Sequence, residues 1–177
     1  YVQTTLRLPT RASQLFAHPL FGKGLSIAYG RDYGKPRIVM FTGTFAWCKK
    51  LSFFDPTSQR RCTFKMGNFV RQVDNTVIRV DQIFIHTFEK ERRLFIRGTV
   101  LAADDSAGDD LVLGNGYRRA LVAGTGTPTT IIGLPSISPD YLYVVPIETD
   151  ADGSISMARQ APEATEFIWS QYTVHWL

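Results

Sequence analysis

Histidine and cysteine are the side chains in this sequence with the widest capacity for catalysis or metal binding. His18, His86 and His175 lie far apart in the sequence, and none stands in a known ligand spacing. Cys48 and Cys62 are too few for a tetrahedral zinc site or a disulfide scaffold, so we expect free thiols in a reducing compartment. These residues therefore predict neither a metal centre nor a covalent framework.

One histidine stands inside an apolar run, VIRVDQIFIHTF, where it follows Ile83 and Ile85. A strand places successive side chains on opposite faces, and we therefore expect His86 to face the surface or to be hydrogen-bonded within the fold. Either position is more typical of a structural histidine than of a catalytic base.

Enzyme motifs are scarce. The sequence has no P-loop, no GxGxxG after a strand, no HExxH and no GxSxG. The acidic run DDSAGDD at 104–110 offers four carboxylates to a hard cation, but it lacks the EF-hand spacing. We predict a solvated loop there, and for the whole chain no catalytic residues, no metal and no cofactor.

Charge is divided unevenly along the chain. Residues 1–97 hold 17 Lys and Arg against 6 Asp and Glu, a net +11, whereas residues 98–177 hold 3 against 10, a net −7. Cations at strand ends and in loops, interleaved with aromatic residues, suit phosphate contact and base stacking. The candidate nucleic-acid contacts are Lys49, Lys50, Arg60, Arg61, Arg92 and Arg93.

The elements that must position these residues are mostly strands. Residues 24–30 and 37–48 alternate or are rich in β-branched and aromatic residues, and both predict strands. A charged loop with a turn at Asp55-Pro56 is expected to follow, over residues 49–61. Residues 66–101 contain three alternating runs separated by turn residues, which predicts an antiparallel meander.

The predicted strands are joined by short turns, and hardly any segment has the 3.6-residue period of a helix. This pattern indicates one all-β domain over residues 1–177. We expect a partly open barrel or compact sandwich of antiparallel strands with short helical connections. No stretch approaches the roughly 20 apolar residues of a membrane span, so we expect no membrane partner.

Three consecutive segments resemble the start of a bromo-adjacent homology (BAH) domain. GNFVRQ stands where that family has a GDxV strand, VIRVDQIF where it has ARVxxI, and RRLFIRGTVLA where a strand leads into an aromatic-Arg-Pro-Glu stretch. YRRALVAGTGTPTTIIGLPSI, DYLYVVPI and FIWSQYTVHW are compatible with the later strands. The resemblance makes residues 64–177 a BAH-like core and residues 1–63 an amino-terminal hairpin extension. Its strongest matches are Gly67, Val70, Arg79, Val80, Ile83 and Phe84.

The resemblance implies a non-catalytic interaction module of a larger nuclear protein, which binds a chromatin protein or histone tail. Some members of the family read methylated lysine through an aromatic cage. This chain has Gly98, Thr99, Val100 and Leu101 where the family has the aromatic-Arg-Pro-Glu stretch, so docking is expected rather than methyl-lysine reading. The expected partner contacts are Trp47, Phe54, Tyr117, Trp169 and Tyr172.

Two further functions fit the sequence. One is a nucleic-acid-binding β-barrel that uses the basic first half, with weak and non-specific binding. The other is a structural, capsid-like β-sandwich subunit. A barrel enzyme with its acids in the 104–110 loop is disfavoured by the missing motifs.

Overall fold

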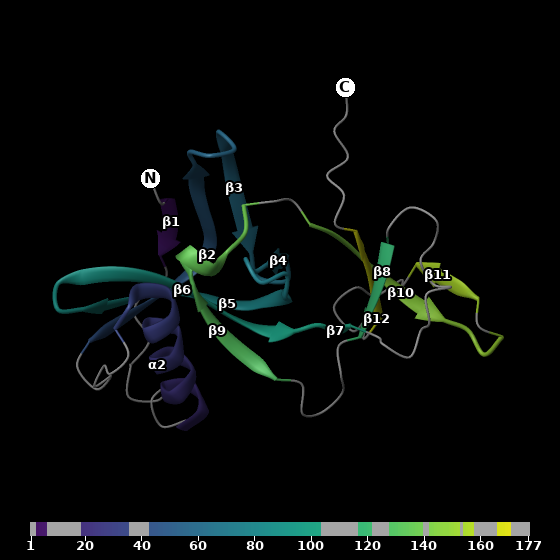
Figure 1. The fold of residues 1–177 in the computed structure, drawn as a ribbon, viewed down its shortest axis with the longest axis horizontal. Helices are drawn as coiled ribbons and strands as arrows, with labels where there is room; N and C mark the ends of the chain where they lie inside the picture. Colours follow the sequence, from purple (N-terminus) through teal and green to yellow (C-terminus); the bar gives the residue numbers. More distant parts are fainter. Residues whose placement is uncertain are drawn as a thin grey trace.

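Within the residues that it describes, the computed structural model shows two antiparallel β-sheets and one α-helix (Figure 1). It describes residues 3–6, 19–35, 43–103, 117–121, 128–139, 142–152, 154–157 and 166–170. All strand pairs within these ranges are antiparallel, which confirms the all-β class. The acidic run at 104–110 lies outside the described residues.

The larger sheet has the strand order β1-β2-β5-β6-β9 and is not closed into a barrel. Strand β3 also pairs with β2, and β4 pairs with β5. The bounds are β1 Gln3–Leu6, β2 Thr44–Asp55, β3 Arg60–Lys65, β4 Phe69–Arg71, β5 Val77–Phe88, β6 Glu91–Val100 and β9 Thr129–Gly133.

The predicted meander is confirmed as β4, β5 and β6. A two-residue turn joins β5 to β6, and both of its residues, Glu89 and Lys90, have the positive φ angles of a tight hairpin turn. A register shift between Val80 and Gln82 moves the inward face of β5 from even to odd positions. One core cluster accordingly buries residues from both halves of β5: Ile78, Val80, Ile83 and Ile85.

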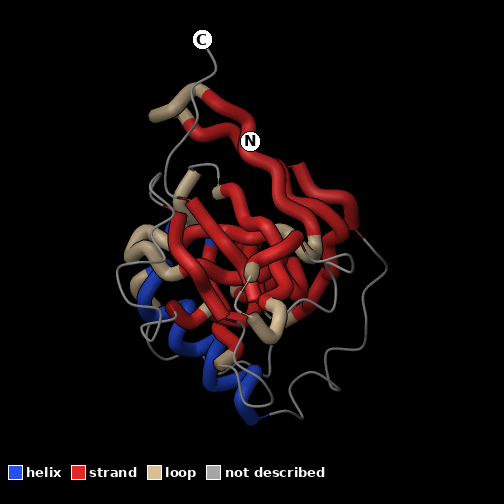
Figure 2. Tube along the Cα trace, turned by 90° about the vertical axis from the view of Figure 1, so that its right-hand side faces the viewer, coloured by secondary structure: helices blue, strands red, loops and turns tan. Residues whose placement is uncertain are grey.

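Residues 24–30 were expected to form a strand, and this prediction was wrong. They lie within helix α2, Pro19–Tyr33, which covers one face of the larger sheet (Figure 2). Phe21, Leu25, Tyr29 and Tyr33 recur every four residues, the spacing of one helix face. The first three are buried against the sheet with Phe84 and Phe95. A window of seven residues was too short to distinguish the four-residue spacing of a helix face from the alternation of a strand.

The prediction of a charged loop over residues 49–61 was also wrong, although the turn expected at Asp55-Pro56 is present. Strand β2 continues to Asp55, and β3 begins at Arg60, so only residues 56–59 form the connection. The charges suggested a loop, but they lie on the exposed positions of a hairpin whose other face is apolar.

The smaller sheet has the order β11-β10-β12-β8-β7. It meets the larger sheet through a small cluster in which the Phe69 and Phe167 rings lie 5.0 Å apart. The strand expected in DYLYVVPI is present as β10, and residues 167–170 of FIWSQYTVHW lie in β12, whereas residues 171–176 lie outside the described residues. The bounds are β7 Ala102–Ala103, β8 Tyr117–Leu121, β10 Tyr143–Thr149, β11 Ile155–Met157 and β12 Glu166–Ser170, and a 3₁₀ turn, η2 (Leu134–Ser136), follows β9.

The division at residue 63 falls inside strand β3 of the larger sheet. Strand β2 pairs with β5 along residues 44–48, and its inward residues Cys48 and Leu51 belong to the same core cluster as Ile83. The division into an extension and a BAH-like core stays a prediction. Among the described helices, none has the length and apolar character to cross a membrane.

Candidate nucleic-acid interface

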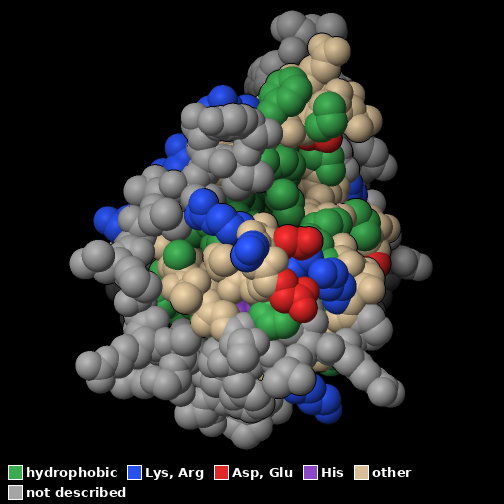
Figure 3. Space-filling model, turned by 90° about the vertical axis from the view of Figure 1, so that its left-hand side faces the viewer, with side chains coloured by type: hydrophobic (Ala, Val, Ile, Leu, Met, Phe, Trp, Pro, Cys, Tyr) green, Lys and Arg blue, Asp and Glu red, His purple; other side chains and the backbone are tan. Residues whose placement is uncertain are grey.

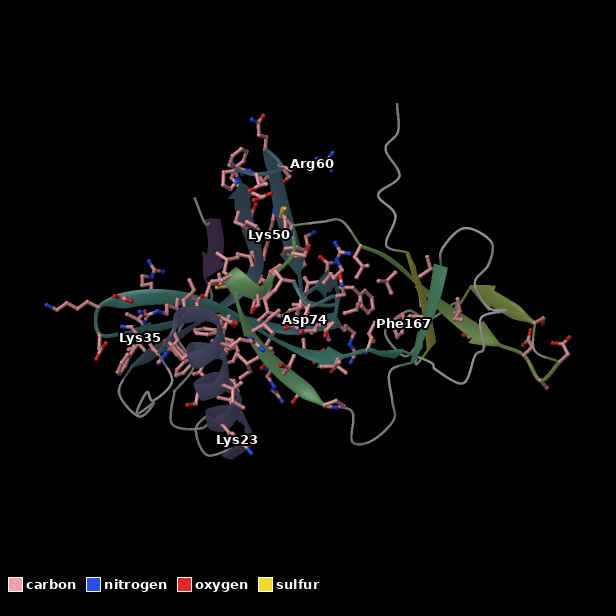
Figure 4. The ribbon with its side chains drawn as sticks, viewed as in Figure 1. Lys23, Lys35, Lys50, Arg60, Asp74 and Phe167 are labelled. Atoms are coloured by element: carbon pink, nitrogen blue, oxygen red, sulfur yellow. The ribbon has the colours of Figure 1, made fainter. Side chains whose placement is uncertain are left out.

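The β2–β3 hairpin rises from the larger sheet (Figure 1) and carries the labelled cations Lys50 and Arg60 (Figure 4). Its inward face is apolar because Leu51, Phe53 and Phe64 pack on the main core. Since side chains alternate along a strand, the intervening residues of β2 and β3 must face outward. The core thereby fixes which hairpin residues are available to a partner.

Three cross-strand pairs make up this outward face. Lys50 is opposite Lys65, Ser52 is opposite Thr63, and Phe54 is opposite Arg61. The Ser52 and Thr63 hydroxyls are hydrogen-bonded at 3.0 Å. We call these six residues the hairpin face. Pairs two residues apart are spaced by roughly 6.6 Å, so the face presents cations at both ends and an aromatic ring at one end. In the middle pair Thr63 is exposed, whereas Ser52 is only 6% exposed.

The pairing of Lys50 with Lys65 places two like charges directly opposite each other. Such a pair destabilises a sheet, because the charges repel across about 5 Å. Both lysines are exposed, and a bound polyanion would replace the repulsion with attraction. Lys65 is a further cation of the basic part of the sequence, and the strand register places it opposite Lys50.

The single acidic residue of the hairpin is engaged in its turn. Asp55 accepts hydrogen bonds from the Ser58 and Thr57 backbone nitrogens. Hydrogen bonds from Ser58, and then from Thr57, lower the pKa of the Asp55 carboxyl. The hairpin, residues 44–65, thus carries five cations against one carboxylate: Lys49, Lys50, Arg60, Arg61 and Lys65 against Asp55.

Four of the six predicted nucleic-acid contacts gather on this hairpin, and all four are exposed: Lys49, Lys50, Arg60 and Arg61. Arg92 and Arg93 lie instead on β6, at the other end of the sheet. Arg92 is exposed, but Arg93 is only 8% exposed. Its guanidinium lies over the rings of Tyr29 and Tyr33, 5.4 and 5.5 Å from their centroids, and pairs with Glu91.

Charges of both signs lie together near the β5–β6 turn, on the face shown in Figure 3. Lys35 pairs with Glu89 there, and Arg93 pairs with Glu91. This end of the sheet therefore differs from the hairpin, where cations predominate.

The predicted partner-binding aromatics have different positions. Phe54 is 48% exposed on the hairpin face. Trp47 is half-buried and packs on the helix-side core, with its ring 5.5 Å from that of Phe84. Tyr117 and Trp169 lie on neighbouring strands of the smaller sheet, opposite Ser170 and Arg118 respectively, and their side chains are outside the described part. Tyr172 lies outside the described residues.

Histidine and cysteine do not form a site in the described part of the chain. His86 is fully buried, stacked on Phe45 and hydrogen-bonded to Tyr29. Cys48 and Cys62 are both buried, and the Cys62 thiol donates to the Pro139 carbonyl at 3.3 Å. Among the residues that the structure describes, no group of three potential ligands is close enough to hold a metal ion.

No family model matches this sequence, and neither the curated proteins nor the solved structures include a significant match.

Proposed function

We propose that this protein is a non-catalytic binding module that holds nucleic acid by its phosphate backbone, without sequence preference, on the β2–β3 hairpin. The observation that carries this proposal is the hairpin face, where Lys50 opposes Lys65 and Phe54 opposes Arg61. Lysine and arginine contact phosphates irrespective of sequence, whereas an exposed aromatic ring can stack on an unpaired base.

The number of cations on the hairpin sets the expected affinity for nucleic acid. Five cations on one hairpin permit only a few simultaneous phosphate contacts, and the carboxylates of the acidic second half of the chain oppose binding over longer distances. The proposal is therefore weak binding that falls steeply with salt, by a log-log slope of roughly −0.9 for each phosphate neutralised on duplex DNA.

The BAH resemblance supports a second, compatible proposal, that the module docks a chromatin protein within a larger nuclear protein. Phe54 is the exposed aromatic residue that suits such a contact, since aromatic residues are enriched among interface hot spots. The tail of a histone is basic, however, and the hairpin face would repel it. Nucleic acid is therefore the partner that the charges favour.

Fluorescence anisotropy with single-stranded and duplex DNA of equal length tests the first proposal. Phe54→Ala should weaken single-strand binding by an amount near the ~1–3 kcal/mol of one stacked base, and should leave duplex binding nearly unchanged. Val73→Ala removes another exposed apolar side chain away from the hairpin and serves as the matched control. Equal effects of the two variants, or salt-insensitive binding of the unmodified protein, would contradict the proposal.

A further inference from the structure

The pairing of β6 with β9 stops early, and a helix side chain fills the gap. The last paired residues are Phe95 and Gly133, so the next pair would join Leu94 to Leu134. Instead, the Tyr33 hydroxyl donates to the Leu94 carbonyl at 3.0 Å and accepts from the Leu134 nitrogen at 3.3 Å. Tyr33 thus replaces one rung of the ladder, and β9 leaves the sheet as η2.

Beyond that rung, β6 has an open edge. In an antiparallel strand the N–H and C=O of every second residue point to the same side. Because the Leu94 carbonyl points away from β5, towards Tyr33, the N–H and C=O of Arg92 point to the same edge. No strand in the described part of the chain pairs with β6 there. Arg92 therefore offers one donor and one acceptor to an added strand.

A groove of about 390 Å³ runs beside this edge. Its apolar lining comes from Ile85, Leu94, Leu134 and Pro135. Tyr33 forms part of the wall, and the position of its ring is fixed by the two hydrogen bonds of its hydroxyl. The lining belongs to β5, β6 and η2, so the groove is built from the sheet itself.

Two cations complete the groove lining, the exposed Arg92 and the buried Arg93. Glu91 pairs with Arg93 through Nη2, whereas Nη1 of Arg93 has no hydrogen-bond partner among the residues that the structure describes. Among the described residues, the groove lining contains no acidic side chain. Its charge is complementary to an anionic ligand.

We propose that this groove binds a short, extended acidic peptide, which adds to the free edge of β6 beside Arg92. A residue opposite Arg92 would lie on the same face as the Arg92 side chain, where a carboxylate forms a cross-strand ion pair. Pairing cannot continue along β6 to Leu94, because Tyr33 and Leu134 already fill that rung. An aliphatic side chain of the peptide would instead lie against the groove lining formed by Leu94 and Leu134. The ligand thus carries an acidic residue and a nearby aliphatic residue. This site is distinct from the hairpin face and goes beyond nucleic-acid binding.

The test is selection of random twelve-residue peptides displayed on phage against the immobilised full chain, followed by binding assays with the enriched peptides made synthetically. Enriched sequences should share an acidic residue and an aliphatic residue at one fixed spacing. Arg92→Glu should weaken their binding at least about tenfold, which is the loss of one good charge-assisted contact. A peptide with Lys in place of the acid should regain binding to Arg92→Glu. Methylation of the backbone nitrogen opposite the Arg92 carbonyl should abolish binding, because it removes the added rung.

Lys90→Asn is the matched control. Lys90 is an exposed cation in the turn between β5 and β6, and it lies outside the groove lining. Asparagine tolerates the positive φ angle of that position. The melting temperature of both variants should match that of the unmodified protein. The proposal is overturned if no peptide is enriched, or if Arg92→Glu and Lys90→Asn weaken peptide binding equally. It is also overturned if duplex DNA displaces the peptides, because this would place them on the β2–β3 hairpin.

Discussion

The hydroxyl of Tyr29 and Nδ1 of His86 lie 2.6 Å apart in the core between α2 and β5. The imidazole is stacked on the Phe45 ring, 4.5 Å between centroids, and it is fully buried. Gly43 makes this packing possible, because a Cβ there would lie 2.4 Å from Nε2 of His86. The helix and the sheet are therefore joined by a neutral polar contact inside an aromatic cluster.

The first prediction concerns pH. Burial, and then the nearby Arg93 charge, lower the pKa of His86 to about 4 from 6.5. Between these values the unfolded chain binds the proton and the folded chain does not. Stability is therefore complete above about pH 6.5 and falls as the pH drops towards 4, by on the order of 3 kcal/mol. Urea unfolding at a series of pH values measures this loss.

His86→Phe is the control for this pH dependence, because a phenyl ring can stack on Phe45 but cannot titrate. Its stability should change much less between pH 6.5 and 4 than that of the unmodified protein. An equally steep fall in His86→Phe would show that other groups cause the acid sensitivity.

The second prediction uses a pair of glycines. A Cβ on Gly98 would lie 2.3 Å from both the Arg79 carbonyl oxygen and Cγ2 of Ile78, whereas a Cβ on Gly22 would meet nothing within 4 Å. Gly98→Ala should cost about 1–3 kcal/mol of stability or more through overpacking. Gly22→Ala, on α2, should add roughly 0.5–1 kcal/mol, because alanine loses less entropy in a helix. Thermal unfolding compares them, and a stable Gly98→Ala protein would show that β5 and β6 are further apart than described here.

The third prediction concerns the buried carboxylate of Asp32, at the end of α2. Burial raises its pKa, but hydrogen bonds from Arg31, Ser136 and the Gly133 nitrogen outweigh this and lower the pKa overall. Asp32 thus ties the helix to β9 and η2 as an anion. Asp32→Asn should cost about 1.5–3 kcal/mol, since hydrogen bonds to a charged group are replaced by weaker ones.

Asp152→Asn provides the comparison, because Asp152 is exposed and an amide oxygen can also accept from the Ser154 nitrogen. Its denaturation midpoint should hardly move. If Asp32→Asn were equally harmless in urea unfolding, the carboxylate would not be holding the helix in place.

The meander was predictable because its signal is local. Ile78 and Val80 stand two positions apart, as do Ile83 and Ile85, and the turn at Glu89 and Lys90 separates this segment from the next strand. The register shift between the two pairs is visible only in the structure. Helix α2 was missed because its apolar residues recur every four positions among several glycines, and a short window of that pattern also alternates.

The candidate site was predictable only in part. Lys49, Lys50, Arg60 and Arg61 were recognised by charge, but their position on paired strands depends on the buried partners of Leu51 and Phe53. The bridge that Tyr33 makes between Leu94 and Leu134 joins residues about sixty and one hundred positions away, and no local pattern contains it.

Duplex DNA binding by Lys50→Glu and Lys23→Glu, measured by anisotropy from roughly 50 to 200 mM salt, tests the central claim most directly. Both lysines are exposed and the two variants have equal net charge, but Lys50 lies on the hairpin face and Lys23 on α2 (Figure 4). Lys50→Glu should lower the affinity at least about tenfold and reduce the log-log salt slope by about one, while Lys23→Glu should change the affinity less than about twofold. Equal losses in the two variants would show that only net charge matters and would contradict an interface on the β2–β3 hairpin.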